Sequence, residues 1–163
     1  MAVSTILGLC EGFDATNFGA GEVLLAEGTR TGMLYILIDG AVEIRKGDFQ
    51  IDVVSEPGAF FGEVSALLNI SHMATVRTLH PSRVYRIEHA VEFLNSYPMI
   101  AMEVARLLAQ RLNGVTNYLV DLKNQFEDQK GHLGMVDEVL QTLLHQQRET
   151  FTPGSARDPD PSI

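Results

Sequence analysis

A short run near the middle of the chain most constrains how it can fold. Residues 60–68 read FFGEVSALL, and residues 74–76 follow as ATV. Gly62 has no side chain, so the backbone there can approach an anion closely. A helical turn that begins after this glycine points free N–H groups at the anion. The run therefore predicts an anion-binding turn between a strand and a short helix.

Closely spaced short strands surround this run, from about residue 18 to residue 87. Residues 34–38 form a nearly continuous apolar strand, and Asp39-Gly40 supplies a turn that needs a positive φ. Residues 42–45 alternate between apolar and charged side chains on the return. Further strands are predicted at residues 50–54, 75–79 and 83–87. Several short strands separated by turns predict a sandwich or a barrel.

The sequence becomes helical from Pro98. Apolar residues recur there at spacings of four and three, which is an a/d seam of more than three heptads. The first turns can pack on the strands of the same chain, but a helix of this length spans about 40 Å and outruns so small a domain. We therefore expect the later seam to meet a partner helix in a two-fold dimer. The expected interface residues are Leu108, Leu112, Val115, Leu119, Leu122 and Phe126.

The strand spacing and the run at residues 60–76 resemble the cyclic nucleotide-binding domain family over about residues 12–125. The family's phosphate-binding cassette reads roughly F-G-E-L-A-L-L-x-x-x-P-R-A-A-T-V. The resemblance implies a mainly β fold with α-helices. An eight-stranded antiparallel β-roll, or jelly roll, is followed by a long C-terminal dimerisation helix and a short tail helix. In the family the long helix pairs two protomers in a parallel coiled coil and closes over the nucleotide.

Four segments follow from the resemblance and the composition. Residues 1–97 are expected to form the β-roll with short flanking helices, and residues 98–128 the dimerisation helix. Gly131 and Gly134 interrupt the helical pattern before a short amphipathic helix at residues 135–148. Residues 150–163 are polar and proline-rich, which predicts a disordered tail.

The resemblance implies a cyclic nucleotide, cAMP or cGMP, as the ligand. It places Gly62 at the phosphate and Glu63 on a ribose hydroxyl, although a helix dipole alone also explains an acid at a helix N-terminus. The hydroxyl of Thr75 can donate to a phosphate oxygen, and the residue would also fit as an ordinary β-branched strand residue. The ligand-binding residues implied by the resemblance are Gly62, Glu63, Val64, Ser65, His72, Met73, Ala74 and Thr75.

His72 occupies the position of the family's cassette arginine. The change removes a permanent charge and a bidentate fork, which costs about 1.5–3 kcal/mol, or roughly ten- to 150-fold in affinity. A protonated imidazole would recover part of this, and affinity would then rise as the pH falls from 8 to 6. Alternatively, His72 is a solvated loop residue. Arg77 is a substitute cation if its side chain faces the pocket.

Composition and motifs exclude several classes of function. A formal net charge of −9 and a pI near 4.9 argue against a broad nucleic-acid surface or an anionic membrane partner. A single cysteine excludes a disulfide framework or a four-cysteine cluster, and the histidines lack metal-ligand spacing. No nucleophile elbow or P-loop is present. We expect no catalytic residues, no metal and no cofactor, and hence no enzyme.

The chain also lacks an apolar run of transmembrane length. Its first ten residues have no basic region of the kind that begins a signal peptide, so we expect an N-terminal helix packed on the core and a cytoplasmic protein. After residue 126 too little sequence remains for a winged helix-turn-helix, which needs about 60 residues. No DNA-binding domain is therefore expected.

Two hypotheses remain. The first is a stand-alone bacterial cyclic nucleotide-binding regulatory sensor, dimeric, that signals to a separate, unidentified protein partner. The second is a ligand-independent dimeric interaction or scaffold protein with a degenerate nucleotide pocket. His72 favours the second, in which binding is weak or lost, and the intact run from Phe61 to Glu63 favours the first. A truncated transcription factor is a more distant third.

Overall fold

The computed structural model describes residues 2–126 and 130–145, so the expected tail at residues 150–163 lies outside the described residues. The chain divides into two compact units, Met1–Leu107 and Leu108–Ile163. The first unit holds all the described strands, the helices α1 (Ala2–Leu9), α2 (Glu63–Leu68) and α3 (Ala90–Ser96), and the beginning of α4 (Pro98–Gln125). The second holds the rest of α4 and α5 (Lys130–His145).

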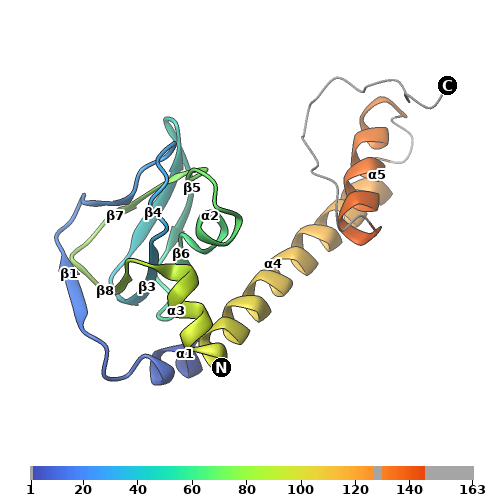
Figure 1. Cartoon of the computed structure of the whole chain (residues 1–163). Helices are drawn as coiled ribbons and strands as arrows, with labels where there is room; N and C mark the ends of the chain where they lie inside the picture. Colours follow the sequence, from blue (N-terminus) through green and yellow to red (C-terminus); the bar gives the residue numbers. More distant parts are fainter. Residues whose placement is uncertain (1, 127–129, 146–163) are drawn as a thin grey trace. The chain divides into compact units, whose positions relative to one another are not determined.

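Eight strands form two antiparallel four-stranded sheets, which confirms the predicted β-roll (Figure 1). One sheet has the order β1-β8-β3-β6 and the other β2-β7-β4-β5. The strands are β1 Ala15–Phe18, β2 Val23–Leu25, β3 Leu34–Asp39, β4 Val42–Lys46, β5 Phe49–Val54, β6 Phe60–Phe61, β7 Thr75–Thr78 and β8 Ser82–Ile87.

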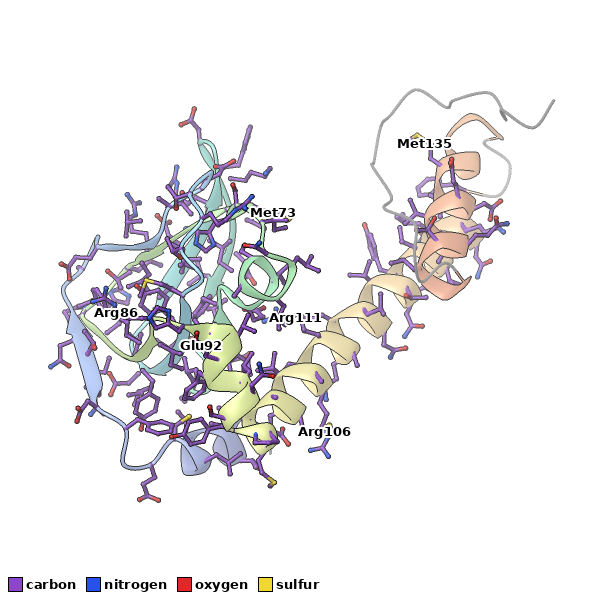
Figure 2. The ribbon with its side chains drawn as sticks, viewed as in Figure 1. Met73, Arg86, Glu92, Arg106, Arg111 and Met135 are labelled. Carbon is purple, nitrogen blue, oxygen red and sulfur yellow. The ribbon has the colours of Figure 1, made fainter. Side chains whose placement is uncertain are left out.

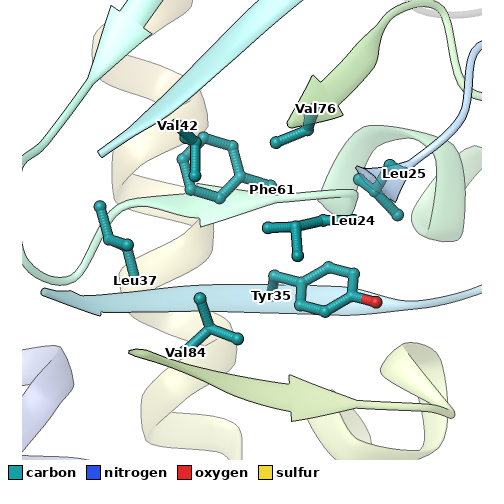
Figure 3. Packing of buried hydrophobic residues seen from close by; sticks show 8 residues of the cluster. All are labelled: Leu24, Leu25, Tyr35, Leu37, Val42, Phe61, Val76 and Val84. Atoms are coloured by element: carbon teal, nitrogen blue, oxygen red, sulfur yellow. The ribbon is translucent and has the colours of Figure 1, made fainter. Parts of the chain in front are cut away.

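The core lies between the two sheets, because strands of both sheets turn apolar side chains inward, whereas most of β5 is exposed. Both sheets contribute to one buried cluster, shown in Figure 3. Its members are Leu24, Leu25, Tyr35, Leu37, Val42, Phe61, Val76 and Val84. The β3–β4 turn closes tightly on this core, since Gly40 has a φ of 103° and an added Cβ would overlap Ser82.

Short helices flank the roll. Helix α1 (Ala2–Leu9) buries Ile6, and Cys10 just after it is also fully buried, so the N-terminal segment is part of the core. Burial raises the pKa of the Cys10 thiol to about 11. Helix α2 (Glu63–Leu68) contacts α3 (Ala90–Ser96).

Helix α4 (Pro98–Gln125) is continuous over 28 residues, as the seam predicted. Within the first unit its first turns bury Ile100 and Val104. Helix α5 runs from Lys130 to His145 and therefore begins earlier than expected and includes both glycines. Its buried Leu140 and the ion pair of Asp137 with Lys123 on α4 stabilise this helix, and packing overrides the weak propensity of glycine. None of the described helices combines the length and apolarity that crossing a membrane requires.

Candidate functional site

The cassette begins where β6 ends, at a glycine that no other residue could replace without strain. Gly62 is the N-cap of α2 and has a φ of 93°. A Cβ on this residue would overlap the carbonyl oxygen of Met33, which lies just before β3. The backbone therefore turns sharply into α2 under the loop that precedes β3.

Helix α2 brings three of the expected residues together. Glu63 is only 4% exposed and Ser65 is also buried, whereas Val64 points away and is exposed. The helix ends after Leu68, because Asn69 takes a left-handed conformation with a φ of 52°. The structure thus places Gly62, Glu63 and Ser65 at one end of a short helix, with the carboxylate turned into the protein.

His72 is a buried residue, and the solvated-loop interpretation of it is wrong. Its side chain is 4% exposed, and Nε2 lies 2.7 Å from Oγ1 of Thr31. Its backbone N–H donates to the carbonyl of Thr29 at 2.8 Å, and its carbonyl accepts from the N–H of Gly28 at 2.9 Å. Burial lowers the pKa of His72, so the imidazole at this position is neutral at pH 7.

The last three expected residues lead into β7. Met73 is 62% exposed. Thr75 accepts a hydrogen bond from the N–H of Glu27 at 3.0 Å and pairs with Arg45 across the sheet. Val76 faces the core, so the alternation of the strand turns Thr75 to the opposite side of the sheet.

Arg77 also points away from the core, where it forms an ion pair with Glu43. The two residues are direct cross-strand partners on β4 and β7. Glu43 also accepts from Nε2 of Gln50 at 2.7 Å, and its carboxylate is buried beneath these partners. The Gln50 amide and then the Arg77 guanidinium lower the pKa of Glu43. Arg77 therefore belongs to this network on the far side of β7 from the core.

Lys46 is a cation at the end of the cassette that the sequence did not single out. Its Nζ donates to the carbonyl of Met73 at 2.8 Å and lies 3.6 Å from Oε1 of Glu27. The sequence pattern of β4 predicts only that Lys46 lies at the end of a strand. The contact of Lys46 with the Met73 carbonyl, which the sequence does not predict, connects it to the cassette.

A separate recess of about 600 Å³ opens elsewhere on the first unit. It lies between the start of β1, the end of β8 and α3, and it contains none of the expected site residues. Arg86 and Glu92, both labelled in Figure 2, line it. Its polar side chains are exposed, so the recess is a surface depression rather than an enclosed pocket.

The expected dimer row lies mostly in the second unit. Leu112 and Val115 are 46% and 52% exposed, and Phe126 is exposed as well. Leu119 and Leu122 are half-buried, near the part of α4 that α5 contacts through Lys123. The open positions of the row are therefore Leu112, Val115 and Phe126.

Comparison with known proteins gives a consistent result. The family model of the cyclic nucleotide-binding domain matches residues 15–94. The potassium channel SKOR of Arabidopsis thaliana is 31% identical over 101 residues, which is 60% of this chain and 12% of the channel. A CRP-like cAMP-activated global transcriptional regulator of Mycobacterium tuberculosis is 27% identical over 125 residues, which is 73% of this chain and 56% of the regulator.

Among solved structures, the catabolite activator protein of Thermus thermophilus has the same fold, with a TM-score of 0.59 and 22% identity. The match covers 75% of this chain and 59% of that protein. The chain thus spans only 12–56% of the length of these two curated relatives.

Proposed function

Residues 15–94 belong to the cyclic nucleotide-binding domain family, and we propose that the chain is a regulatory module that binds a cyclic nucleotide at the cassette. In this proposal the module acts as a two-fold dimer and signals to a separate protein. We propose a regulatory role and no catalytic one: the site would bind a ligand, and binding would change the conformation of the protein around it.

The geometry of Gly62 carries the proposal. The turn at Gly62 has a positive φ and packs closely against the Met33 carbonyl, so α2 begins there, and the first N–H groups of this helix would meet a phosphate. Glu63 lies beside this turn with its carboxylate sheltered from water, which suits a strong hydrogen bond from a ribose hydroxyl. Ser65, Met73 and Ala74 are proposed to complete the wall of the site, whereas the side chains of Val64 and Thr75, although expected there, point away from it.

The charge of the site is unusual, and it sets the expected affinity. His72 is neutral and already bonded to Thr31, so it adds no permanent cation to the cassette. We propose that binding is weak and that the rise in affinity on acidification begins only below the ordinary histidine pKa of 6.5. A protonated imidazole could then partly neutralise the phosphate.

The same observation supports a second candidate function. A buried His72 that fastens the cassette to the loop at Thr31 could hold the roll in one form without ligand. The chain would then be a dimeric interaction or scaffold protein with a degenerate pocket. The two functions differ in a single measurable property, which is nucleotide binding.

The dimer is proposed from the exposed row on α4. Leu112 and Val115 present apolar side chains to water, and a second copy of the same helix would cover them. Leu108, Leu119, Leu122 and Phe126 would extend the contact. A two-fold axis parallel to α4 places each residue near its own copy.

Calorimetric titration with cAMP and cGMP at pH 6 and pH 8 tests the function. Saturable binding that Glu63→Gln weakens supports the regulatory module. Glu56→Gln, an exposed acid outside the cassette, is the matched control and should leave the affinity unchanged. Absence of binding at millimolar nucleotide, in the wild type and in His72→Arg, supports the scaffold.

A further inference from the structure

The strand register places one carboxylate on the core-facing side of the sheet that carries the cassette. Val54 pairs with Val42, and Asp52 pairs with Ile44. Val42 belongs to the core, and Ile44 and Val54 pack against it. Paired residues of an antiparallel ladder share one side of the sheet, so Asp52 lies on the core-facing side. It is nevertheless exposed, because the core ends before it.

Three more residues extend this exposed edge toward the cassette. Lys46 is two residues beyond Ile44 on the same side of β4, and Phe49 is its cross-strand partner. Phe49 is 80% exposed. The ammonium of Lys46 binds the carbonyl of Met73, which directly follows His72 and is labelled in Figure 2. We name Lys46, Phe49, Asp52 and Met73 the sheet mouth.

The register shift in β5 explains why an aromatic ring faces this way. The shift lies between Ile44 and Arg45, and it sets Gln50 opposite Arg45. Gln50 then reaches Glu43 on the outer side of the sheet. Phe49, which directly precedes Gln50, consequently lies on the same side as Lys46, where no core covers it.

The sheet mouth combines two kinds of recognition. Phe49 offers an exposed aromatic ring, which suits the face of a flat aromatic base. Asp52 offers acceptor oxygens only, which suits adjacent N–H donors. The backbone N–H of Val53 donates to Oδ1 of Asp52 at 2.8 Å and holds this carboxylate in place. Within the described part of the chain, no cation pairs with Asp52.

We propose that the sheet mouth holds the base of the nucleotide and that Asp52 selects guanine over adenine. Guanine presents its N1–H and its N2 amino group side by side, and a carboxylate accepts from both. Adenine presents its N6 amino group beside an acceptor nitrogen, which would face the carboxylate unfavourably. This inference rests on the nucleotide site proposed above and names its preferred ligand as cGMP.

The spacing of the strands agrees with this arrangement. The cassette ends on β7, and β5 lies two strands away in the order β7-β4-β5. Two strand spacings amount to about 10 Å. A nucleotide with its phosphate at the cassette can therefore extend its base across β4 to Asp52 on β5.

Calorimetric titration of the full chain with cGMP, cIMP and cAMP tests the inference. We expect cGMP to bind about tenfold more tightly than cAMP, because a hydrogen-bonding site discriminates against a ligand that leaves it unpaired. Cyclic IMP keeps N1–H but lacks the amino group, so its affinity should be intermediate. Asp52→Asn should reduce the preference to less than about twofold.

Two variants serve as controls. Asp48→Asn removes an exposed carboxylate at the β4–β5 turn and should leave the preference unchanged. Phe49→Ala should weaken cGMP and cAMP alike, because it removes stacking rather than hydrogen bonding.

The outcomes separate this inference from the function on which it rests. If cGMP and cAMP both bind and Asp52→Asn leaves their ratio unchanged, the role of Asp52 is overturned and the nucleotide site stands. If no cyclic nucleotide binds to the wild type or to His72→Arg, the nucleotide site itself falls, and the assignment of Asp52 falls with it.

Discussion

His72 and Thr31 join the cassette to the loop before β3 through a side-chain hydrogen bond of 2.7 Å between Nε2 and Oγ1. His72 is buried whereas Thr31 is exposed, and main-chain bonds of His72 to Thr29 and Gly28 flank the side-chain bond. The ring at the position of the family's arginine is thus held by the protein itself. Its protonation state and its freedom to meet a ligand depend on this local structure.

Replacing His72 by arginine should strengthen nucleotide binding by about one to two orders of magnitude, because a guanidinium forms charge-assisted bonds with phosphate at any ordinary pH. Calorimetry with cGMP and cAMP at pH 8 measures the gain. His72→Gln, which keeps a hydrogen-bonding side chain without a charge, should resemble the wild type. An arginine variant that binds no better than the glutamine variant would contradict this prediction.

Acid should destabilise the fold through the same residue. Burial lowers the pKa of His72 in the folded state below its ordinary 6.5, so the unfolded chain takes up this proton more readily. The free energy of unfolding should therefore fall as the pH drops below about 6.5. Urea titrations between pH 8 and pH 5 measure this slope.

His72→Gln should make the acid slope shallower, since the variant has no proton to bind at this position. His89→Gln, at an exposed histidine, is the matched control and should keep the slope of the wild type. Equal slopes in the wild type and in His72→Gln would show that His72 does not contribute to acid sensitivity.

Gly62→Ala should destabilise the protein by more than a substitution at an unobstructed glycine. A left-handed conformation costs a residue with a side chain about 1–3 kcal/mol. Gly12→Ala pays this cost alone, since Gly12 has a φ of 101° and no atom near its missing Cβ. Gly62→Ala adds the overlap with the Met33 carbonyl, so its midpoint in urea should be lower. Equal urea midpoints for Gly62→Ala and Gly12→Ala would mean that the loop before β3 moves to accommodate the added Cβ at no cost.

Leu112→Asp should dissociate the proposed dimer, because the two copies would place like charges close to the two-fold axis. Light scattering coupled to size exclusion measures the mass at micromolar concentration. Gln110→Asp adds the same charge on another side of α4 and should leave the dimer intact. A wild type that is already monomeric would refute the dimer directly.

The fold was predictable because its signals are local. Glycine turns fixed where strands end, and Gly62 combined a positive φ with a close backbone approach, which glycine alone tolerates. The seam from Pro98 predicted a long helix, and the helix is continuous through Gly114. These features depend on a few neighbouring residues, so a single sequence contains them.

The side-chain environment was harder to predict because it depends on distant partners. Nothing in residues 69–73 distinguishes a solvated His72 from one that meets Thr31, which is 41 positions away. The pattern of β4 predicts an ordinary outward charge at Glu43, but the side chains of Arg77, Arg45 and Gln50 contact its carboxylate, which is buried. Gly131 and Gly134 predict a break before α5, whereas α5 includes both, and the Asp137–Lys123 ion pair links it to α4.

The pairing of Glu43 with Arg77 also bears on how fast a ligand can arrive. Arg77 and Arg45 both lie within 4 Å of the Glu43 carboxylate, which neutralises part of their positive charge. Their guanidinium groups therefore attract a free anion only weakly. The chain as a whole carries a formal net charge of −9. Electrostatic steering of a cyclic nucleotide toward this protein is therefore unfavourable or weak. Because added salt screens the repulsion between a negative protein and a negative ligand, salt should not slow their association.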